Sequence, residues 1–411
     1  MRVVVVGSGG REHVLAWALS STAEVVVVPG NAGMARAGIR CAPSIEAAGP
    51  ADLVVVGPEE PLVAGLADRL RAAGTAAFGP GADGARIEGS KAHLKQVLER
   101  AGVPTAASCA FGAGEGAAAE TFLRSLPAPW VVKTDGLAAG KGVFVTDDVE
   151  AAVADVRSKL SGASFGDAGR TVVIEEGLTG PEVSVLAVCD GRAADDGVVV
   201  LPVARDHKRV GEGETGPNTG GMGAFSPVPD APADLLDQVL ERMVLPTLHT
   251  LVADGVDYRG VLYAGIMLTP DGPKLLEYNV RFGDPEAQVV LPRLDGDLAA
   301  LLASAAAGRI DPSAISVRPE ACVGVVLAAP GYPAAPVTGA TITGLEDAGP
   351  LVFCAGVDEQ GGRLVTAGGR VVCVAALGAD GPTARRAAYR ASDHVTFAGG
   401  VLRREDVAVT A

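Results

Sequence analysis

Short runs of branched apolar residues alternate with amphipathic stretches through residues 1–90 of the chain. The runs at 2–7, 24–30 and 52–57 consist mostly of valine and end in glycine. Strands that are buried on both faces of a parallel sheet have this pattern, whereas half-exposed strands alternate apolar with polar residues. The stretches between the runs have helical character. We therefore expect a Rossmann-like N-terminal domain with a parallel sheet at 1–90.

The pattern changes after residue 90 and again after residue 310. Residues 91–310 mix helices and strands without regular alternation, which is typical of an α+β domain. We expect a small mobile lid at about 115–182 and a larger platform in this central domain. Residues 318–411 contain short apolar strands and one final helix, which predicts a compact β-rich third domain with no evident catalytic group. The predicted fold class is a multidomain α/β and α+β protein.

The composition of the chain bears on which partners the protein can bind and on the redox state of its compartment. The 411 residues are 48% hydrophobic and have a net charge of −15, which disfavours binding to nucleic acid or to an anionic membrane. No apolar run approaches the roughly 20 residues that a membrane-spanning helix needs. The six cysteines are scattered without a C-x-x-C pair, so neither a zinc site nor a disulfide framework is indicated. We expect buried thiols in a reducing cytoplasm.

The segment 206–227 concentrates charged residues and glycines and has almost no apolar side chain to bury. Such a segment is either a mobile functional loop or a disordered tether. Ordered patterning resumes on both sides of it, which favours the functional loop. Glycines let a backbone approach an anion closely, and the charged residues at 206–209 can order that anion.

Two further glycine-rich turns contain basic residues. The turn at 7–11 follows a strand and opens a helix, so it either binds a phosphate or is a plain tight turn. Glu12 stands where a dinucleotide fingerprint has glycine or alanine, which disfavours NAD. The turn at 136–142 is one residue short of a P-loop, and Gly142 replaces its serine or threonine. Lys133 and Lys141 still suit a flap over a polyphosphate, with solvated surface lysines as the alternative.

The segment 277–286 combines carboxylates, an amide and an arginine. Along an extended strand, Glu277, Asn279 and Arg281 point to the same side. Carboxylate and amide oxygens bind hard cations such as Mg²⁺, and an arginine neutralises a transferring phosphoryl group. A solvent-facing polar strand edge is the alternative. No Ser/His/Asp or Cys/His arrangement is visible, so covalent acyl-enzyme chemistry is not expected.

Eight motifs together resemble one family. GSGGREHVLAW, PGNAG, VGPEEPLVAG, EGSKAHLKQVL, KTDGLAAGKGV, DHKRVGEGETGPNTGGMGAFSP, EYNVRFGDPEAQ and GGRVVCVAALG are similar, in order and spacing, to the glycinamide ribonucleotide synthetases of the ATP-grasp superfamily. The resemblance covers nearly the whole chain. It implies ATP-dependent ligation of glycine to 5-phosphoribosylamine through glycyl phosphate, with Mg²⁺ or Mn²⁺, by a cytoplasmic monomer. Another ATP-grasp ligase, such as one that carboxylates a ribonucleotide, is the alternative.

The resemblance also implies roles for residues at matching positions. The ATP contacts would be Lys91, Lys133, Gly140, Lys141, Gly142, Glu175, Glu176, Leu178 and Glu182. The metal ligands would be Glu277 and Asn279, and the catalytic groups would be Asp206, Lys208, Arg281 and Asp284. The remaining substrate contacts would be Gly9, Gly10, Arg11, Asn31, Glu59, Thr219, Gly220, Gly221 and Gly283. Ala264 and Gly265 stand where many ATP-grasp enzymes have a further metal-binding carboxylate, so the number of metal ions stays open.

Overall fold

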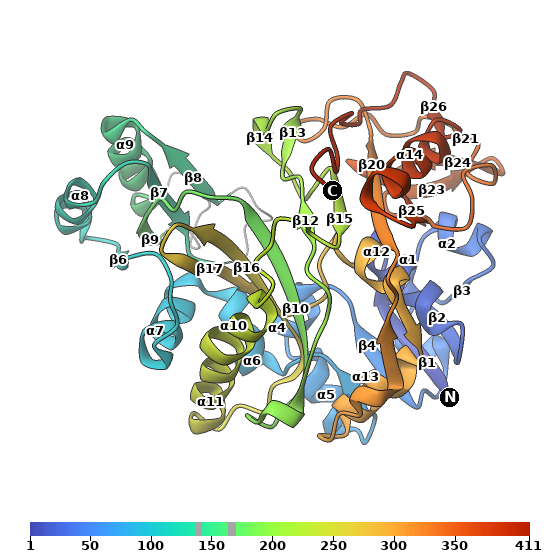
Figure 1. The fold of residues 1–411 in the computed structure, drawn as a ribbon, viewed down its shortest axis with the longest axis horizontal. Helices are drawn as coiled ribbons and strands as arrows, with labels where there is room; N and C mark the ends of the chain where they lie inside the picture. The colour runs from blue at the N-terminus through green and yellow to red at the C-terminus, as the bar shows by residue number, and fades with distance from the viewer. Residues whose placement is uncertain (137–141, 163–169) are drawn as a thin grey trace.

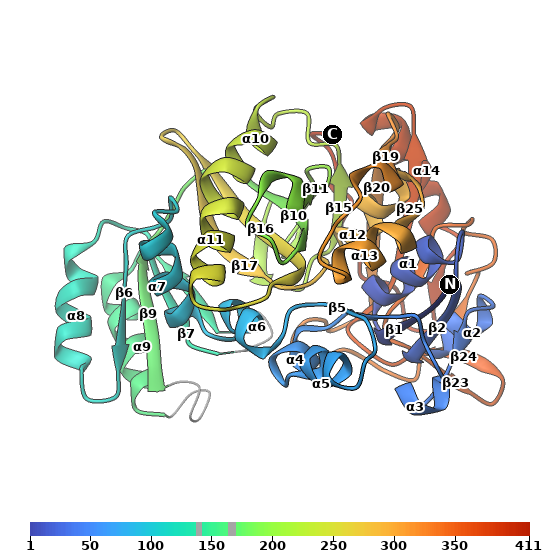
Figure 2. The ribbon, with the colours of Figure 1, turned by 90° about the horizontal axis from the view of Figure 1, so that it is seen from below.

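The computed structural model describes residues 1–136, 142–162 and 170–411. Three groups of elements surround a common centre, and a fourth projects to one side (Figures 1 and 2). The described residues include no helix that is both long enough and apolar enough to span a bilayer.

The N-terminal body is a five-stranded parallel sheet in the order β3-β2-β1-β4-β5. The valine runs form its central strands, and their side chains are almost fully buried on both faces, as the sequence predicts. Its strands are β1 (Arg2–Gly7), β2 (Glu24–Pro29), β3 (Arg40–Cys41), β4 (Leu53–Val56) and β5 (Ala77–Phe78). Its helices are α1 (Gly10–Leu19), α2 (Ala32–Arg36), α3 (Ile45–Ala48), α4 (Glu59–Val63) and α5 (Leu66–Ala72).

The projecting body is an antiparallel sheet in the order β6-β9-β7-β8, which helices α8 and α9 cover. It has its own hydrophobic cluster, separate from the clusters that run through the rest of the molecule. Its elements are β6 (Ser108–Gly112), α8 (Gly116–Ser125), β7 (Trp130–Thr134), β8 (Val143–Thr146), α9 (Val149–Leu160) and β9 (Thr171–Glu176). Helices α6 (Ala82–Gly89) and α7 (Lys91–Ala101) join it to the N-terminal body. This body, which we call the lid body, overlaps residues 115–182, for which the sequence predicts a mobile lid.

The central sheet is antiparallel, with the order β11-β10-β16-β17. Its strands are β10 (Glu182–Asp190), β11 (Val198–Val200), β16 (Arg259–Thr269) and β17 (Gly272–Asn279). Leu235–Ala253 is one continuous helical stretch, as α10 (Leu235–Val239), a π-helical turn (Leu240–Val244) and α11 (Leu245–Ala253). Helices α12 (Ala287–Val290) and α13 (Leu298–Ala306) follow β17.

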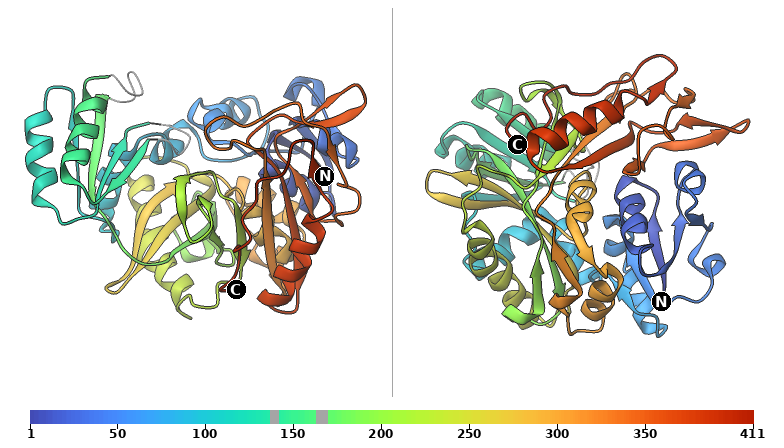
Figure 3. Two further views of the ribbon diagram at one scale, coloured as in Figure 1. Left: turned by 90° about the horizontal axis from the view of Figure 1, so that it is seen from above. Right: turned by 45° about the vertical axis from the view of Figure 1, so that its right-hand side comes forward.

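The third sheet, in the order β12-β15-β20-β25-β22, combines strands from two distant parts of the sequence. Its strands are β12 (Arg205–Asp206), β15 (Gly223–Ser226), β20 (Ala321–Ala328), β22 (Val352–Cys354) and β25 (Arg370–Gly378), and α14 (Gly381–Ser392) packs on it. The expectation that 206–227 has almost nothing to bury is wrong for β15. All four residues of β15 are buried, because this strand pairs with β20. Figure 3 shows the C-terminal elements beside both the N-terminal body and these central strands.

Paired short strands complete the fold. The glycine-rich segment forms the hairpin of β13 (Arg209–Gly211) and β14 (Thr215–Asn218). The other pairs are β18 (Leu294–Gly296) with β19 (Ile315–Val317), β21 (Ile342–Thr343) with β26 (Thr396–Phe397), and β23 (Val357–Gln360) with β24 (Arg363–Thr366).

Candidate active site

A cavity of about 400 Å³ lies where the N-terminal body, the central sheet and the third sheet meet. It is lined by both carboxylates and cations, a combination that suits a polyanionic ligand with a metal ion. The charged lining residues are Arg11, Glu59, Glu88, Lys91, Asp206, Lys208, Glu277, Arg281, Asp284, Glu286 and Arg370.

A larger cavity of about 1210 Å³ lies between α1, α2 and the third domain. Trp17, Val352 and Phe353 give its wall a partly apolar character. None of the described residues that the sequence singles out for the site lines this cavity. The smaller cavity is therefore the candidate active site on chemical grounds, in spite of its size.

The end of strand β17 brings Glu277 and Asn279 to the cavity. The pairing register between β16 and β17 shifts just before this end. Gly265 pairs with Glu277, whereas the next residue of β16, Ile266, pairs with Leu275. Such a bulge changes the direction of the side chains that follow it. Glu277, Asn279 and Arg281 all line the cavity, as the sequence predicts. Tyr278 lines it too, and Arg281 lies just beyond the end of β17, so alternation along the strand is not the whole reason.

The cavity ends of Glu277 and Asn279 fit a hard divalent cation. In the part of the chain that the structure describes, neither side chain makes a hydrogen bond or an ion pair. The described residues contain no cluster of three or more His, Cys, Asp or Glu side chains arranged for a metal. A cation here would therefore complete its coordination with oxygens of a ligand or of water.

Two carboxylates fix Arg281 in the cavity wall. Its Nε lies 3.2 Å from Glu59 Oε2, and its Nη2 lies 3.3 Å from Glu88 Oε1. Glu88 Oε2 also accepts a hydrogen bond from the backbone N–H of Val280 at 2.7 Å. Burial raises the pKa of Glu88, whereas Arg281 and Arg11 overcome the effect of burial at Glu59 and lower its pKa. Glu88 was not among the predicted site residues, because it comes from α6, far from Arg281 in the chain.

Lysines gather where the lid body meets the central sheet. Lys133 Nζ lies 3.0 Å from Glu175 Oε1, and Lys95 Nζ lies 3.2 Å from the same oxygen. Burial lowers the pKa of Lys95 to about 8, against the attraction of Glu175. Lys91 lines the cavity and donates a hydrogen bond to the carbonyl of Gly136 at 3.1 Å. Glu175 thus neutralises two lysines in this structure.

Besides Lys91, one of the predicted ATP contacts that the structure describes lines the cavity. Gly142 lines it, whereas Gly140 and Lys141 lie outside the described residues. Glu176 accepts a hydrogen bond from the N–H of Ala107 at 3.0 Å. Leu178 is half-buried just after β9.

Two residues of the glycine-rich segment, Asp206 and Lys208, form an ion-pair chain. Lys208 Nζ lies 2.8 Å from Asp206 Oδ1 and 2.9 Å from Glu182 Oε2. Thr219 donates to the Lys208 carbonyl from its N–H at 2.7 Å and from its hydroxyl at 2.8 Å. The charged side chains at the start of the segment are thereby held at the cavity.

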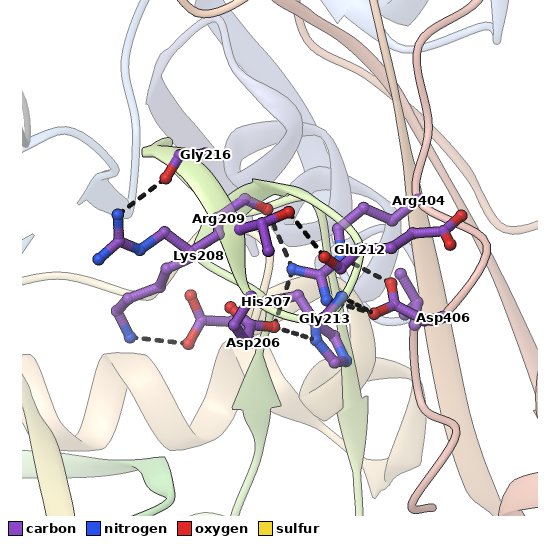
Figure 4. A network of polar contacts seen from close by, with 12 residues as sticks. Asp206, His207, Lys208, Arg209, Glu212, Gly213, Gly216, Arg404 and Asp406 are labelled. Carbon is purple, nitrogen blue, oxygen red and sulfur yellow. Dashed lines mark hydrogen bonds and ion pairs between the residues drawn. The ribbon is translucent and has the colours of Figure 1, made fainter. Parts of the chain in front are cut away.

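The C-terminal segment fixes the same hairpin from the opposite side (Figure 4). The buried Arg404 lies 2.7 Å from an Asp406 oxygen and 2.8 Å from Glu214 Oε1. It also donates a hydrogen bond to the Arg209 carbonyl at 3.0 Å. His207 Nε2 accepts a hydrogen bond from the backbone N–H of Ala408 at 3.1 Å. These contacts attach the hairpin to the third domain, so the segment is ordered and is not a disordered tether.

Three of the predicted substrate-contact glycines lie where an added side chain would meet a close neighbour. A Cβ at Gly220 would collide with the Arg370 guanidinium, and one at Gly221 with the ring of Pro285. Gly221 also has a φ of +110°, which side-chain-bearing residues rarely adopt. A Cβ at Gly283 would collide with the Glu286 carboxylate.

Arg370, at the start of β25, brings the third domain into the cavity. It donates hydrogen bonds to the carbonyls of Gly220 and, at 2.7 Å, of Asp284, and its Nη2 lies 3.1 Å from Asp284 Oδ2. Although burial opposes ionisation of Asp284, Arg370 and Arg11 lower the pKa of its carboxyl. Tyr332 accepts a hydrogen bond at its hydroxyl from the N–H of Gly220 at 3.1 Å. The sequence showed no evident catalytic group in the third domain, and Arg370 was not among the predicted site residues, although it lies in the motif GGRVVCVAALG and opens a buried strand.

The turn after β1 reaches the cavity through Arg11. Its Nη1 donates to the Phe282 carbonyl at 3.3 Å, and its Nε pairs with Glu12 Oε1 at 2.7 Å. Positions where Cβ atoms of Gly9 and Gly10 would stand are 3.8 Å from the Asp284 carboxylate. Asn31 does not line the cavity, and its side-chain amide donates to the carbonyls of Ser8, Cys354 and Ala355.

Comparisons with known proteins agree with this architecture. Residues 1–88, 89–287 and 322–410 match the family models of the N domain, the ATP-grasp (A) domain and the C domain of phosphoribosylglycinamide synthetase. A phosphoribosylamine–glycine ligase of Caulobacter vibrioides is 47% identical, with 98% of this chain and 97% of that protein covered. The corresponding ligase of Vibrio cholerae is 44% identical, with the same shares covered.

Solved structures give the same result. A crystal structure of phosphoribosylamine–glycine ligase from Thermotoga maritima has a TM-score of 0.87 and 36% identity, covering 99% of this chain and 100% of that one. A biotin carboxylase from Campylobacter jejuni has a TM-score of 0.72 at 15% identity, covering 97% of this chain and 92% of that one, and shares the fold alone. With three matching domain models and relatives similar over nearly their full length, the chain belongs to the phosphoribosylglycinamide synthetase family.

Proposed function

We propose that the cavity is the active site of a phosphoribosylamine–glycine ligase. In this reaction ATP phosphorylates the carboxylate of glycine, and the amine of 5-phosphoribosylamine displaces the phosphate. The products are glycinamide ribonucleotide, ADP and phosphate, in purine biosynthesis. The observation that carries the proposal is that Glu277, Asn279, Arg281, Asp284 and the glycine-rich segment line one cavity in a chain of this family.

The chemical problem is to activate a carboxylate. A free carboxylate is a poor electrophile, and phosphorylation gives it a good leaving group, so the protein must mainly position anions and neutralise charge. Arg281, held between Glu59 and Glu88, presents a fixed cation to the transferring phosphoryl group. Asp284, with Arg370 beside it, and Gly283 form the glycine side. Asp206, Lys208 and the backbone at Thr219, Gly220 and Gly221 close over both substrates.

Lysines and the metal ligands hold ATP. Lys91, Lys133, Gly140, Lys141 and Gly142 contact its phosphates, while Glu175, Glu176, Leu178 and Glu182 lie around adenine and ribose. Glu277 and Asn279 hold Mg²⁺ or Mn²⁺, which when bound neutralises phosphate charge during transfer. On the other side, Gly9, Gly10, Arg11, Asn31 and Glu59 face 5-phosphoribosylamine. We further propose a cytoplasmic monomer, for which the six unpaired cysteines suit a reducing compartment.

The test is ADP release by the purified protein with Mg·ATP. Glycine and freshly generated 5-phosphoribosylamine are added separately and then together, and the amide product is identified by mass. Full turnover should need both substrates. Turnover with another carboxylate in place of glycine would reject the substrate and keep the ATP-grasp chemistry.

A matched pair of variants tests the metal ligand. Glu277→Gln removes one charged oxygen donor and should raise the Mg²⁺ concentration for half-maximal activity at least tenfold, about 1.4 kcal/mol. Asp271→Asn makes the same change at the exposed turn of the same hairpin and should leave the Mg²⁺ dependence unchanged. Equal Mg²⁺ dependence in the two variants would rule out Glu277 as a ligand.

A further inference from the structure

One carboxylate of the cavity, Glu286, differs from its neighbours in what it contacts. Asp206 lies beside Lys208, Asp284 beside Arg370, and Glu59 and Glu88 share Arg281. Among the described residues, Glu277 and Glu286 line the cavity without an ion pair. Glu277 is the metal ligand proposed above, whereas Glu286 has no assigned role and is 3% exposed.

Neutral hydroxyl groups hold Glu286 instead. The Tyr263 hydroxyl donates to Glu286 Oε1 at 2.7 Å, and the Ser184 hydroxyl lies 2.8 Å from the Tyr263 hydroxyl and 3.4 Å from the same Oε1. Both residues are buried in the central sheet, Tyr263 on β16 and Ser184 on β10. The other oxygen, Oε2, faces Gly283 and accepts no hydrogen bond from another residue of the described chain.

The second half of the reaction needs a proton acceptor. When the amine nitrogen forms the C–N bond to glycyl phosphate, it becomes positively charged. It must lose one proton as the carbonyl re-forms and the C–O bond to phosphate breaks. A carboxylate that is paired with a cation is a weak acceptor, because the cation stabilises its ionised form. A buried carboxylate that is held only by hydroxyls is a stronger one.

We propose that Glu286 is the catalytic residue that accepts this amine proton, and that Tyr263 and Ser184 position its carboxylate. The inference rests on the proposed function, because it concerns the second step of the same reaction. Burial and the nearby Asp206 raise the pKa of Glu286, while Lys208 and the Tyr263 hydroxyl lower it. Arg281 and Arg370 also face Glu286 from the other walls. A raised pKa brings the acceptor closer to neutral pH, where proton transfer is most efficient.

Gly283 is explained by the same arrangement. Its missing side chain leaves the space that the Glu286 carboxylate occupies. A larger residue at position 283 would displace the acceptor, so the glycine serves the position of Glu286 as well as any contact with substrate.

The experiment compares Glu286→Gln with wild type by measuring ADP and amide product in the same quenched samples. Glutamine keeps the shape and removes the acceptor, so amide formation should fall at least 100-fold, within the usual range for a lost general base. ADP formation should fall less, because glycyl phosphate still forms and is then hydrolysed. Hydroxylamine added to the variant should trap that intermediate as glycine hydroxamate.

The pH profile gives a second readout, which a merely structural role would not move. Wild-type kcat/KM for 5-phosphoribosylamine should fall on the acid side as Glu286 becomes protonated, and Glu286→Gln should lack this limb. Tyr263→Phe removes a hydrogen bond that stabilises the ionised carboxylate, so it should move the limb to higher pH. This variant decides the question if Glu286→Gln does not fold.

Asp190→Asn is the matched control, because Asp190 is a buried carboxylate at the far end of the same strand as Ser184. It should keep one ADP per amide product and the acid limb of the pH profile.

Three outcomes would overturn the inference. ADP and amide falling together with the limb intact would place the defect in phosphorylation. A raised KM for glycine at unchanged kcat would mean that Glu286 binds the glycine ammonium group. A Glu286→Gln variant with unchanged amide formation would mean that the departing phosphate accepts the amine proton. A wild-type protein that makes no amide from glycine would instead refute the proposed function.

Discussion

Replacing Arg370 by methionine tests whether the third domain holds the wall of the active site. Removing one partner of a buried ion pair costs about 3–5 kcal/mol, because the other charge stays buried and unpaired. Here the Arg370 side chain is 21% exposed, and Asp284 keeps a hydrogen bond from Gln288 at 2.7 Å. We therefore expect a loss below this range, about 2–3 kcal/mol. If this whole free energy is lost from stabilisation of the transition state, kcat/KM decreases about 30- to 160-fold.

The assay is steady-state formation of glycinamide ribonucleotide, measured together with the thermal unfolding midpoint. Arg390→Met serves as the control, because Arg390 is an exposed arginine on α14 of the same domain. It should leave kcat/KM unchanged. An Arg370→Met variant whose kcat/KM stays within twofold of the wild-type value would refute the reasoning.

A double-mutant cycle then shows through which residue Arg370 acts. Asp284→Asn removes the charge that Arg370 neutralises. In that background Arg370→Met should cost less than about 1 kcal/mol, or about fivefold in kcat/KM, since the pair is already broken. An undiminished 30-fold loss in both backgrounds would mean that Arg370 does not act through Asp284.

Two further predictions concern contacts that the third domain makes outside the cavity. The buried His13 accepts a hydrogen bond from the backbone N–H of Cys354 at 2.8 Å, and burial lowers its pKa from 6.5 to about 4. It stays neutral in the folded chain while the unfolded chain takes up a proton, so this residue should remove about 3 kcal/mol from the free energy of unfolding between pH 7 and pH 4. In urea titrations His13→Gln should show a smaller loss than wild type, and equal slopes would contradict the assignment. Arg404→Met should lower the thermal midpoint and destabilise the fold by about 1–2 kcal/mol, because Glu214 and Asp406 lose their shared cation but stay partly exposed to solvent. An unchanged midpoint would mean that this network does not hold the hairpin.

The cavity-facing end of β17 shows how far local pattern reaches. The order Glu277, Asn279, Arg281 places three side chains on one side of an extended chain, and all three line the cavity. The valine runs likewise identify buried parallel strands, because a strand covered on both faces has no polar positions. In both cases the residue types that form the element or line the cavity can be read from a short stretch of sequence.

The partners of these groups were decided only by tertiary structure. Glu59 and Glu88 both contact Arg281, although Glu59 lies 222 positions before it in the sequence. Glu88 also bonds to Val280, which lies 192 positions after it. Arg370 reaches Gly220 across 150 positions. No local period relates such residues, because their proximity depends on how whole sheets pack.

The same distinction explains β15 and Glu286. The composition of 206–227 indicates a loop, yet its last strand is buried because a partner strand from the third domain lies beside it. Glu286 reads as one more acidic residue, and only its hydroxyl neighbours from β10 and β16 distinguish it from the paired carboxylates. The sequence by itself therefore determined which elements form and which chemical groups they present. Tertiary packing decided which charges are neutralised, since that depends on side chains brought together from distant parts of the chain.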